Sequence, residues 1–534
     1  MAAITRQAIT SSRPRSWRLR SPLLFWAVGL IAIGVGLFVG YLHQASIAPE
    51  NSDGAAQALQ AWDMLHGNLL LHGWSMSDVS FYTTELPEYA LVELVRGLTP
   101  QVIHISAALT WTLIVLLGAL VARGDARGRE GLLRAVIAAT ILVAPSIVPG
   151  TRVLMLSPNH TGTSVPILVT LLALDKLPAR RWAAALIGIL LIWGQVGDQL
   201  VIYSAALPLT LICLLRAVWS RREGKQEGQG RTSYDAWLTL AGAVSIVLAL
   251  AIPQLIHALG GYYQAPLQGL LASPSQWVSH ARTVFACLRI LFGALPGGTA
   301  GFLGFVAWLR VACMIFAGLA LLGGIAFFRR IGRTAQVLVL GILGTLAAGV
   351  FGTHVTQLSD AHEIAVVFPM GAALAGRLFP DRVLRGRRLL ASGPVLGAVL
   401  GCFLAALAIA ATAPPARPSN LALANWLQAH NLRAGMSGYW QADSVTLDSH
   451  ERVLIFPAVV SARGISPYRW ETKEQWFNAA VTNANFVVED SSDRTGYSVP
   501  LAWLEDRFGH PARVYHFQDY TILTWKENLL TRIS

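Results

Sequence analysis

Three of the carboxylates in the long segment between the first two apolar runs of this sequence are candidates for chemistry. Asp53, Glu85 and Glu88 lie within residues 44 to 100, a stretch of about 57 residues. Connections of that length in compact proteins are usually functional. A carboxylate there can act as a general base, which takes a proton from a reacting hydroxyl. Asp53 has an equally good structural explanation, because Ser52 and Asp53 stand where a helix N-cap belongs, and the two glutamates could simply be solvated.

A second set of candidates carries positive charge and would suit an anionic ligand such as a phosphate. Arginine binds phosphate through two parallel hydrogen bonds. A protonated histidine offers a positive charge and an N–H donor to the same ligand. Arginines near a bilayer also extend to lipid headgroups, which explains at least half of them without a ligand. The candidates are Arg152, His160, Arg282, Arg289, His354 and His362.

Asp198 joins two short apolar runs with almost no loop between them. An ionisable group at that place is costly unless it faces a cavity. The sequence leaves two interpretations equally open: Asp198 lines a cleft, or it belongs to an ordinary hairpin turn at the surface.

Composition shows which elements must hold these residues. Of the 534 residues, 54% are hydrophobic and only 13% are charged, and the mean hydropathy is +0.51. Such a chain belongs in lipid.

The four cysteines lie far apart inside apolar stretches, which predicts no disulfide and no thiolate metal site. A spanning helix needs roughly 20 mostly apolar residues, and eleven segments qualify, starting near residues 21, 101, 133, 161, 182, 199, 236, 302, 334, 363 and 389.

The arginines predict the orientation of these spans. With residues 1–20 as a basic cytoplasmic tail, alternate loops place 25 basic residues inside and five at the outer side of the membrane part. Loops rich in Lys and Arg stay in the cytoplasm. Residues 276 to 295 are then an amphipathic helix on the outer surface, with Arg282 and Arg289 on one face. The membrane part spans residues 21–412, and the C-terminus lies outside the cell membrane.

Residues 413–534 have the composition of a separate extracytoplasmic α/β domain. This segment holds 11 basic and 12 acidic residues, so the net charge of +12 belongs to the membrane part and does not indicate nucleic acid. About 120 residues suffice for one core. Pattern predicts helices over 421–428 and 501–508 and strands over 453–460, 486–488 and 520–525. The predicted fold class is mainly α: a polytopic membrane bundle of about 11 helices with this α/β domain.

The first outer loop shows a recognisable pattern. After Asp53, apolar residues recur at helical spacing up to Gly67, which predicts an amphipathic helix on the membrane surface. Glu85, Pro87 and Glu88 then precede the second span. The loop resembles the first extracytoplasmic loop of GT-C superfamily glycosyltransferases, especially the protein O-mannosyltransferase and lipid A aminoarabinose transferase branches. The segment from Asp360 to Pro369, which contains His362, resembles the start of a late span in that superfamily.

The resemblance implies an enzyme that moves a sugar from a polyprenyl-phosphate donor to a glycan, lipid or protein acceptor. Asp53 would be the general base, with inversion at the sugar, and Glu85 and Glu88 would position the acceptor or a divalent cation, Mg²⁺ or Mn²⁺. The superfamily often has Asp-Glu where this chain has Asp53-Gly54, and a basic residue where it has Leu86. Metal dependence and the donor therefore stay open.

Two other functions fit a membrane bundle with buried charges. A transporter or lipid flippase would use them along its pathway, but transporters commonly show repeated halves, and the sequence shows no internal repeat. A non-catalytic envelope protein would use its outer domain to bind a partner or a glycan.

Overall fold

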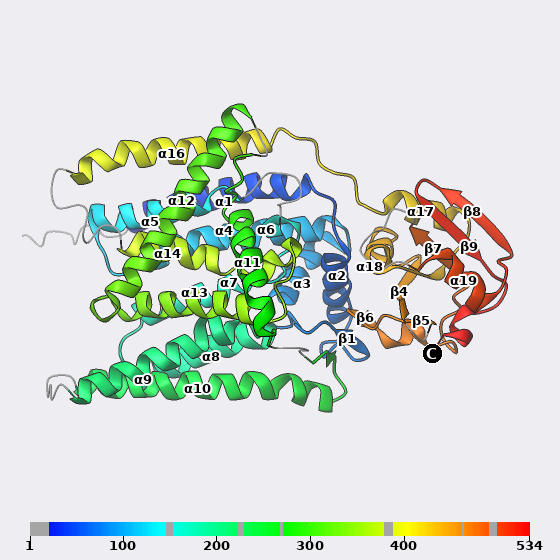
Figure 1. The fold of residues 1–534 in the computed structure, drawn as a ribbon, viewed down its shortest axis with the longest axis horizontal. Coiled ribbons are helices and arrows are strands. Elements are labelled where there is room, and N and C mark those ends of the chain that lie inside the picture. Colours follow the sequence, from blue (N-terminus) through cyan, green and yellow to red (C-terminus); the bar gives the residue numbers. More distant parts are fainter. Residues whose placement is uncertain are drawn as a thin grey trace, which may run out of the picture.

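The structure is a computed structural model in which a helical bundle carries a smaller domain at one end (Figure 1). It describes residues 21–145, 153–222, 229–266, 271–297, 300–378, 388–461, 464–490 and 499–533. The predicted basic tail, residues 1–20, and Arg152 lie outside the described residues. The mainly α membrane bundle with a C-terminal sheet-containing part confirms the predicted fold class.

A helix stands at each of the eleven predicted spans. These helices are α1 (Ser21–Ser46), α4 (Gln101–Arg123), α5 (Gly128–Leu142), α7 (Ser164–Lys176), α8 (Arg181–Gly197), α9 (Leu207–Arg222), α10 (Gln229–Ala258), α12 (Gly301–Ala326), α13 (Arg333–Phe351), α14 (Val367–Leu378) and α16 (Arg388–Ala410). By length and composition, seven of the described helices could cross a membrane: Val28–Ser46, Gln101–Arg123, Ile202–Ser220, Ser233–Ala258, Gly301–Ala326, Arg333–Phe351 and Gly393–Ala410.

The remaining helices of the bundle are shorter than a full span. Helices α7 and α14 have 13 and 12 residues, whereas about 20 are needed to cross a bilayer. Helix α7 begins just after the turn at His160, α8 ends just before Asp198, and α14 begins just after His362. Backbone without helical hydrogen bonds is tolerated at membrane depth only when protein surrounds it or it lines a cavity. His160, Asp198 and His362 therefore lie beside the ends of these short helices, where protein can surround the backbone.

The surface helix predicted at residues 276–295 is present as α11 (Trp277–Leu291). It runs across the direction of the bundle helices at the end that faces the C-terminal domain (Figure 1). Arg282 is exposed and Arg289 is half-buried. The short helices η4 (Pro274–Gln276), η5 (Phe328–Arg330), α6 (Val153–Leu156) and η6 (Leu358–Ile364) connect longer ones, and η2 (Ile202–Ala206) is a π-helical turn before α9.

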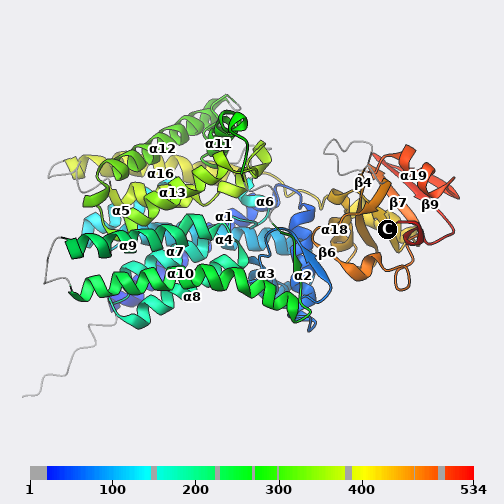
Figure 2. The ribbon, with the colours of Figure 1, turned by 60° about the horizontal axis from the view of Figure 1, so that its bottom comes forward.

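The first loop folds into helix α2 (Ser52–Leu65), strand β1 (Trp74–Met76) and helix α3 (Glu85–Arg96). Helix α2 is amphipathic, as predicted, and it lies across the end of the bundle (Figures 1 and 2). Its N-cap is Asn51, whose side chain accepts a hydrogen bond from the Gly54 N–H at 3.1 Å. The interpretation of Asp53 as the cap is therefore wrong, and its carboxylate is available for other contacts.

The C-terminal domain contains a six-stranded mixed sheet in the order β5-β4-β3-β7-β9-β8. Apolar residues alternate between its two faces, as expected for a sheet covered on both sides: along β7, Phe486 and Val488 enter one core and Val487 the other. The predicted helices and strands of this domain are present, while β3, β5, β8 and α18 had no prediction. The elements are α17 (Leu421–Ala429), β3 (Ala434–Ser437), α18 (Tyr439–Asp448), β4 (Leu454–Ser461), β5 (Gly464–Pro467), β6 (Thr472–Lys473), η7 (Glu474–Phe477), β7 (Phe486–Asp490), α19 (Leu501–Phe508), β8 (Arg513–Phe517), β9 (Tyr520–Thr524) and η8 (Leu529–Arg532).

A second, three-stranded sheet ties the domain to the bundle. Strand β1 of the first loop pairs in parallel with β2 (Tyr263–Gln264) and antiparallel with β6 of the C-terminal domain. The Lys473 ammonium adds an ion pair with Asp63 of α2 at 3.0 Å. One apolar cluster includes residues from both α2 and the six-stranded sheet. The first loop and the C-terminal domain therefore form one packed unit at the end of the bundle.

Candidate active site

Asp53 lies in the first turn of α2, between the bundle and the C-terminal domain. Its Oδ1 accepts a hydrogen bond from the Tyr439 hydroxyl at 2.5 Å, and its Oδ2 accepts one from the Asn51 amide at 3.1 Å. Burial raises the pKa of Asp53 above its ordinary value of 3.8, although the Tyr439 hydrogen bond and the charges of His362 and His160 act to lower it. A carboxylate of raised pKa is a stronger base than an ordinary aspartate.

Asp198 and His160 form a buried pair near this carboxylate. Asp198 is only 1% exposed, so it lies in the interior and the hairpin-turn interpretation is wrong. Its Oδ2 contacts the His160 Nδ1 at 2.9 Å and accepts from the Thr163 hydroxyl at 2.6 Å, while Oδ1 accepts from the Leu200 N–H at 2.8 Å. Three donors fix the carboxylate, and the carboxylate in turn fixes the imidazole.

The other side of the His160 ring faces His362 and Glu363. The two imidazoles are stacked, with centroids 5.1 Å apart, and the Glu363 Oε1 lies 3.7 Å from Nε2 of each. Burial lowers the pKa of His160, but the charges of Glu363 and Asp198 outweigh it and raise the pKa to about 10. The imidazole is then a cation at neutral pH. His160 also has a left-handed backbone, with φ +55°, an arrangement that is uncommon outside glycine and often marks functional sites.

These three residues also offer the ligands that a metal ion needs. The ligand atoms of His160, His362 and Glu363 all lie within 4.8 Å of one another. Two imidazoles and one carboxylate suit zinc and similar transition metals, whereas Mg²⁺ and Mn²⁺ prefer oxygen. A carboxylate on the far nitrogen of a ligating histidine, as Asp198 is placed here, is the usual support of such sites. The donors therefore fit a divalent cation of the zinc type better than the expected Mg²⁺ or Mn²⁺.

The two glutamates of the loop are placed differently from each other. Glu85 is 1% exposed and lies against the His160 turn, where a Cβ added to Gly162 would come within 2.6 Å of its Oε1. Burial raises the pKa of Glu85 to about 8. Glu88 turns toward the bundle and accepts a hydrogen bond from the Thr110 hydroxyl at 2.7 Å, and burial raises the pKa of Glu88 to about 7. Neither group is an ordinary solvated acid.

A cavity of about 260 Å³ lies beside this cluster. Asp198, Glu363, Asp78 and His354 contribute its charged and titratable lining. The His354 Nδ1 is 3.9 Å from the Asp78 carboxylate. Burial, together with the neighbouring Glu363, raises the pKa of Asp78. The cavity is large enough for a small polar ligand.

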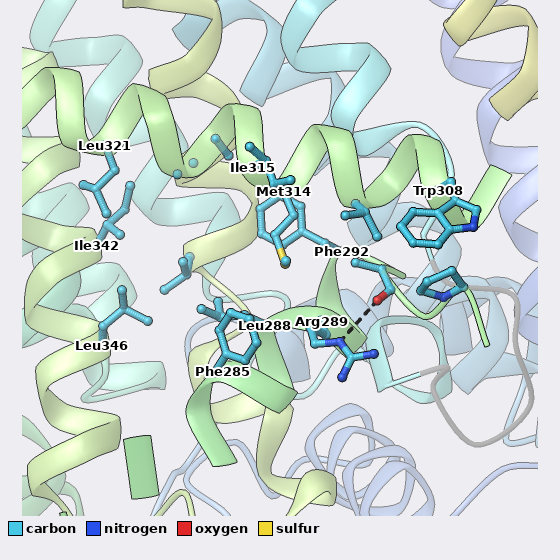
Figure 3. A pocket seen from close by; sticks show the side chains of 17 residues that line it. Phe285, Leu288, Arg289, Phe292, Trp308, Met314, Ile315, Leu321, Ile342 and Leu346 are labelled. Atoms are coloured by element: carbon cyan, nitrogen blue, oxygen red, sulfur yellow. Dashed lines mark hydrogen bonds between the residues drawn. The ribbon is translucent and has the colours of Figure 1, made fainter. Parts of the chain in front are cut away.

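A larger groove of about 620 Å³ runs along α12, bordered by α11, α13 and α14. Figure 3 shows Arg289 at one end of a row of apolar side chains, with Leu321, Ile342 and Leu346 at the other end. The Arg289 Nε donates to the Ala294 carbonyl at 3.4 Å. From Trp308 to Leu321 the groove follows helix for on the order of 20 Å. An apolar groove with a cation at one end is complementary to an anionic lipid, which has an apolar tail and a negative headgroup.

The structure brings together Asp53, Glu85, His160, Asp198, His354 and His362, which come from four separate parts of the sequence. Glu88 faces α4, Arg282 is exposed, and Arg289 belongs to the apolar groove. Sequence reasoning missed four residues of the site, namely Asp78, Glu363, Tyr439 and Glu471, the last of which has its carboxylate 3.3 Å from the Tyr439 hydroxyl. Glu363 adjoins His362 in the sequence, and Tyr439 is followed directly by Trp440. Only the tertiary structure connects Glu363 and Tyr439 with Asp53.

Comparison with known proteins gives a clear result for the fold. No family model matches the sequence, and no curated protein matches it. The crystal structure of ArnT from Cupriavidus metallidurans bound to undecaprenyl phosphate has a TM-score of 0.55 at 11% identity, over 93% of this chain and 98% of that chain. The apo form of ArnT gives a TM-score of 0.55 at 13% identity, over 96% and 99%.

The likeness to ArnT extends over almost the whole of both chains, so it includes the C-terminal domain as well as the bundle. At this identity it shows the fold and leaves the chemistry to the residues of the site. The chain therefore has the fold seen in ArnT.

Proposed function

We propose that this protein is a membrane glycosyltransferase that moves a sugar from a polyprenyl-phosphate donor to an acceptor hydroxyl. The observation that carries the proposal is the position of Asp53, a half-buried carboxylate of raised pKa near the stacked His160 and His362 imidazoles. The site lies at one end of a bundle with the fold of ArnT, a protein whose crystal structure contains undecaprenyl phosphate. Release of polyprenyl phosphate from such a donor is the activity to measure.

In the proposed reaction, Asp53 takes the proton of the acceptor hydroxyl as its oxygen bonds to the anomeric carbon. The bond from that carbon to the donor phosphate breaks on the opposite face, and polyprenyl phosphate leaves. Attack opposite the leaving group inverts the anomeric configuration. Glu85 takes part as a second catalytic group, since with a pKa of about 8 it is a neutral hydrogen-bond donor at pH 7. Glu88 supports this part of the loop through Thr110.

The departing phosphate needs positive charge, and stabilising it is the larger contribution to rate. We assign this task to the imidazolium of His160, which Asp198 orients, with His362, stacked beside it, as a further contact to the phosphate. His354 lines the adjoining cavity and contacts the sugar. Arg289 at the end of the apolar groove binds the lipid phosphate as it arrives, and the exposed Arg282 attracts it from the membrane surface.

The lipid tail of the donor would occupy the groove along α12. Gly318 lines this groove, and a Cβ added there meets no atom within 4 Å, so a larger side chain fits without displacing protein. We expect Gly318→Leu to raise the KM for donor about 10-fold, equivalent to about 1.4 kcal/mol, with little change in kcat. The control is Gly36→Leu on α1, where the space is equally open. Equal donor KM values in both variants and the wild type would contradict this position of the tail.

A metal ion held by His160, His362 and Glu363 is the alternative source of positive charge for the departing phosphate, since a ligating imidazole is neutral and His160 cannot be a cation and a ligand at once. When bound, an ion of the zinc type would act as a Lewis acid toward a phosphate oxygen. We expect purified protein to retain about one equivalent of such a metal by elemental analysis, and His362→Ala to lose it. His354→Ala is the control, because His354 lies in the same region outside the set of three ligands. Wild-type protein as free of metal as His362→Ala would refute the metal site.

The orientation completes the proposal. The first loop, α11, the His160 turn and the C-terminal domain lie at one end of the bundle (Figures 1 and 2). The basic loops predicted to be cytoplasmic alternate with them along the chain, so transfer takes place on the outer face of the cytoplasmic membrane.

A further inference from the structure

The C-terminal domain reaches the proposed active site through the start of helix α18. The Ser52 hydroxyl, next to Asp53, donates to the Tyr439 carbonyl at 2.7 Å. Nearby, the Ser419 N–H donates to the Glu50 carboxylate at 2.6 Å. These contacts bind the start of α18 and the segment before α17 to the residues that precede Asp53. The backbone of Tyr439 is therefore held beside α2 by a contact that does not involve its own side chain.

Tyr439 lies between two acids. Its hydroxyl oxygen is 2.5 Å from Oδ1 of Asp53 and 3.3 Å from Oε2 of Glu471. The single hydroxyl proton belongs in the shorter contact, and burial raises the pKa of Tyr439, so the hydroxyl keeps that proton. Burial together with Asp53 raises the pKa of Glu471 to about 8, so Glu471 is protonated at neutral pH and can donate to the tyrosine oxygen. The donors then run in one direction, from Glu471 through Tyr439 to Asp53.

We propose that Tyr439 is a positioning residue that the C-terminal domain contributes to the active site, where its hydroxyl holds the Asp53 carboxylate toward the acceptor. This inference rests on the proposed function, in which Asp53 is the base. It gives the outer domain a direct part in the reaction. Without this domain Asp53 would lack the shorter of its two side-chain hydrogen bonds.

The geometry favours positioning over obstruction of the base. Each carboxylate oxygen has two lone pairs, and Tyr439 and Asn51 use one on each oxygen. One acceptor position on each oxygen therefore remains for a substrate hydroxyl. The other charged groups that act on this region are His160, His362, Asp443 and Asp78, and the Asp443 carboxylate is fully buried in α18.

The test is Tyr439→Phe in the full-length protein, assayed for kcat, KM and pH dependence. A hydrogen bond to a charged group contributes enough to predict a fall in kcat of about 10- to 100-fold, with KM little changed. Loss of a donor to the carboxylate should also move the acid limb of the pH profile to higher pH. Tyr520→Phe is the matched control, since it removes a tyrosine hydroxyl that donates to Asn420 at 3.0 Å in the same domain.

An unchanged kcat and acid limb in Tyr439→Phe would overturn the inference, and so would a rise in kcat, which would show that Tyr439 obstructs the base. If Tyr439→Phe does not fold, Glu471→Ala removes the donor behind the tyrosine and should shift the same limb, while Glu471→Gln retains a donor and should not. Asp53→Asn separates the two proposals. A fully active Asp53→Asn rejects Asp53 as the base, whereas an inactive Asp53→Asn beside a normal Tyr439→Phe rejects only the positioning role.

Discussion

Replacing Asp53 by Asn should lower the transfer rate by about 10²- to 10⁴-fold, the usual contribution of a general base. The amide is nearly isosteric and can still accept the Tyr439 hydrogen bond, so we expect the fold to persist. The rate should be measured as release of polyprenyl phosphate from a labelled donor, with thermal unfolding as the check on folding. In the wild type, activity should rise with pH through the pKa of Asp53, which burial raises above 3.8, because the base acts only when deprotonated.

The control for this variant is Asp506→Asn, an exposed aspartate on α19 of the C-terminal domain. It removes the same charge from the chain without entering the site. A folded Asp53→Asn protein with the wild-type rate would show that another group takes the acceptor proton.

Replacing Asp198 by Asn should have the second largest effect. The carboxylate accepts from three donors and holds His160 as a cation, so the neutral amide removes that charge and the preferred ring orientation. Changes to groups that support a catalytic or ligating histidine commonly cost 10- to 100-fold in activity. We expect a loss of that size in kcat, accompanied by a lower melting temperature, since a buried network is disrupted.

Stability alone could explain a slower Asp198 variant, so the control must also disrupt a buried acid. Asp175 lies near the other end of α7 and pairs with Arg377 at 2.6 Å. Asp175→Asn should lower the melting temperature and leave kcat near that of the wild type. Equal losses of kcat in the two variants would mean that Asp198 is structural.

The membrane part of the fold could be predicted because lipid imposes simple rules on sequence. Every predicted span coincides with a helix, since apolar length is read directly from the chain. The surface helix α11 could be predicted because Arg282 and Arg289 interrupt an apolar run. An additional span there would also place the basic loop that follows on the outer side of the membrane. The sequence predicts full spans at α7, α8 and α14, but these helices have only 13, 17 and 12 residues. Tertiary contacts of the polar residues beside them end each helix early, and apolar length does not reveal such contacts.

The candidate site was only partly predictable, for a physical reason. Asp53 and His362 stand in local patterns that resemble a superfamily, but the contact between Asp53 and Tyr439 joins residues 386 positions apart. No local pattern specifies such a pair. Glu363 and Glu471 likewise become meaningful only when packing places them against His160 and Tyr439. The apolar groove is formed by four helices, so no one of them predicts it.

The most direct test is whether the protein separates a sugar from its lipid carrier. Purified protein in liposomes would receive undecaprenyl-phosphate hexoses, pentoses and amino sugars, each labelled with one isotope in the sugar and another in the lipid, together with envelope glycans, lipids and proteins as acceptors. We expect one donor to be consumed, with free polyprenyl phosphate appearing as its sugar moves to an acceptor. Labels that stay together while the donor changes leaflet would contradict transfer and indicate a flippase. A folded protein that leaves every donor unchanged would contradict it as well.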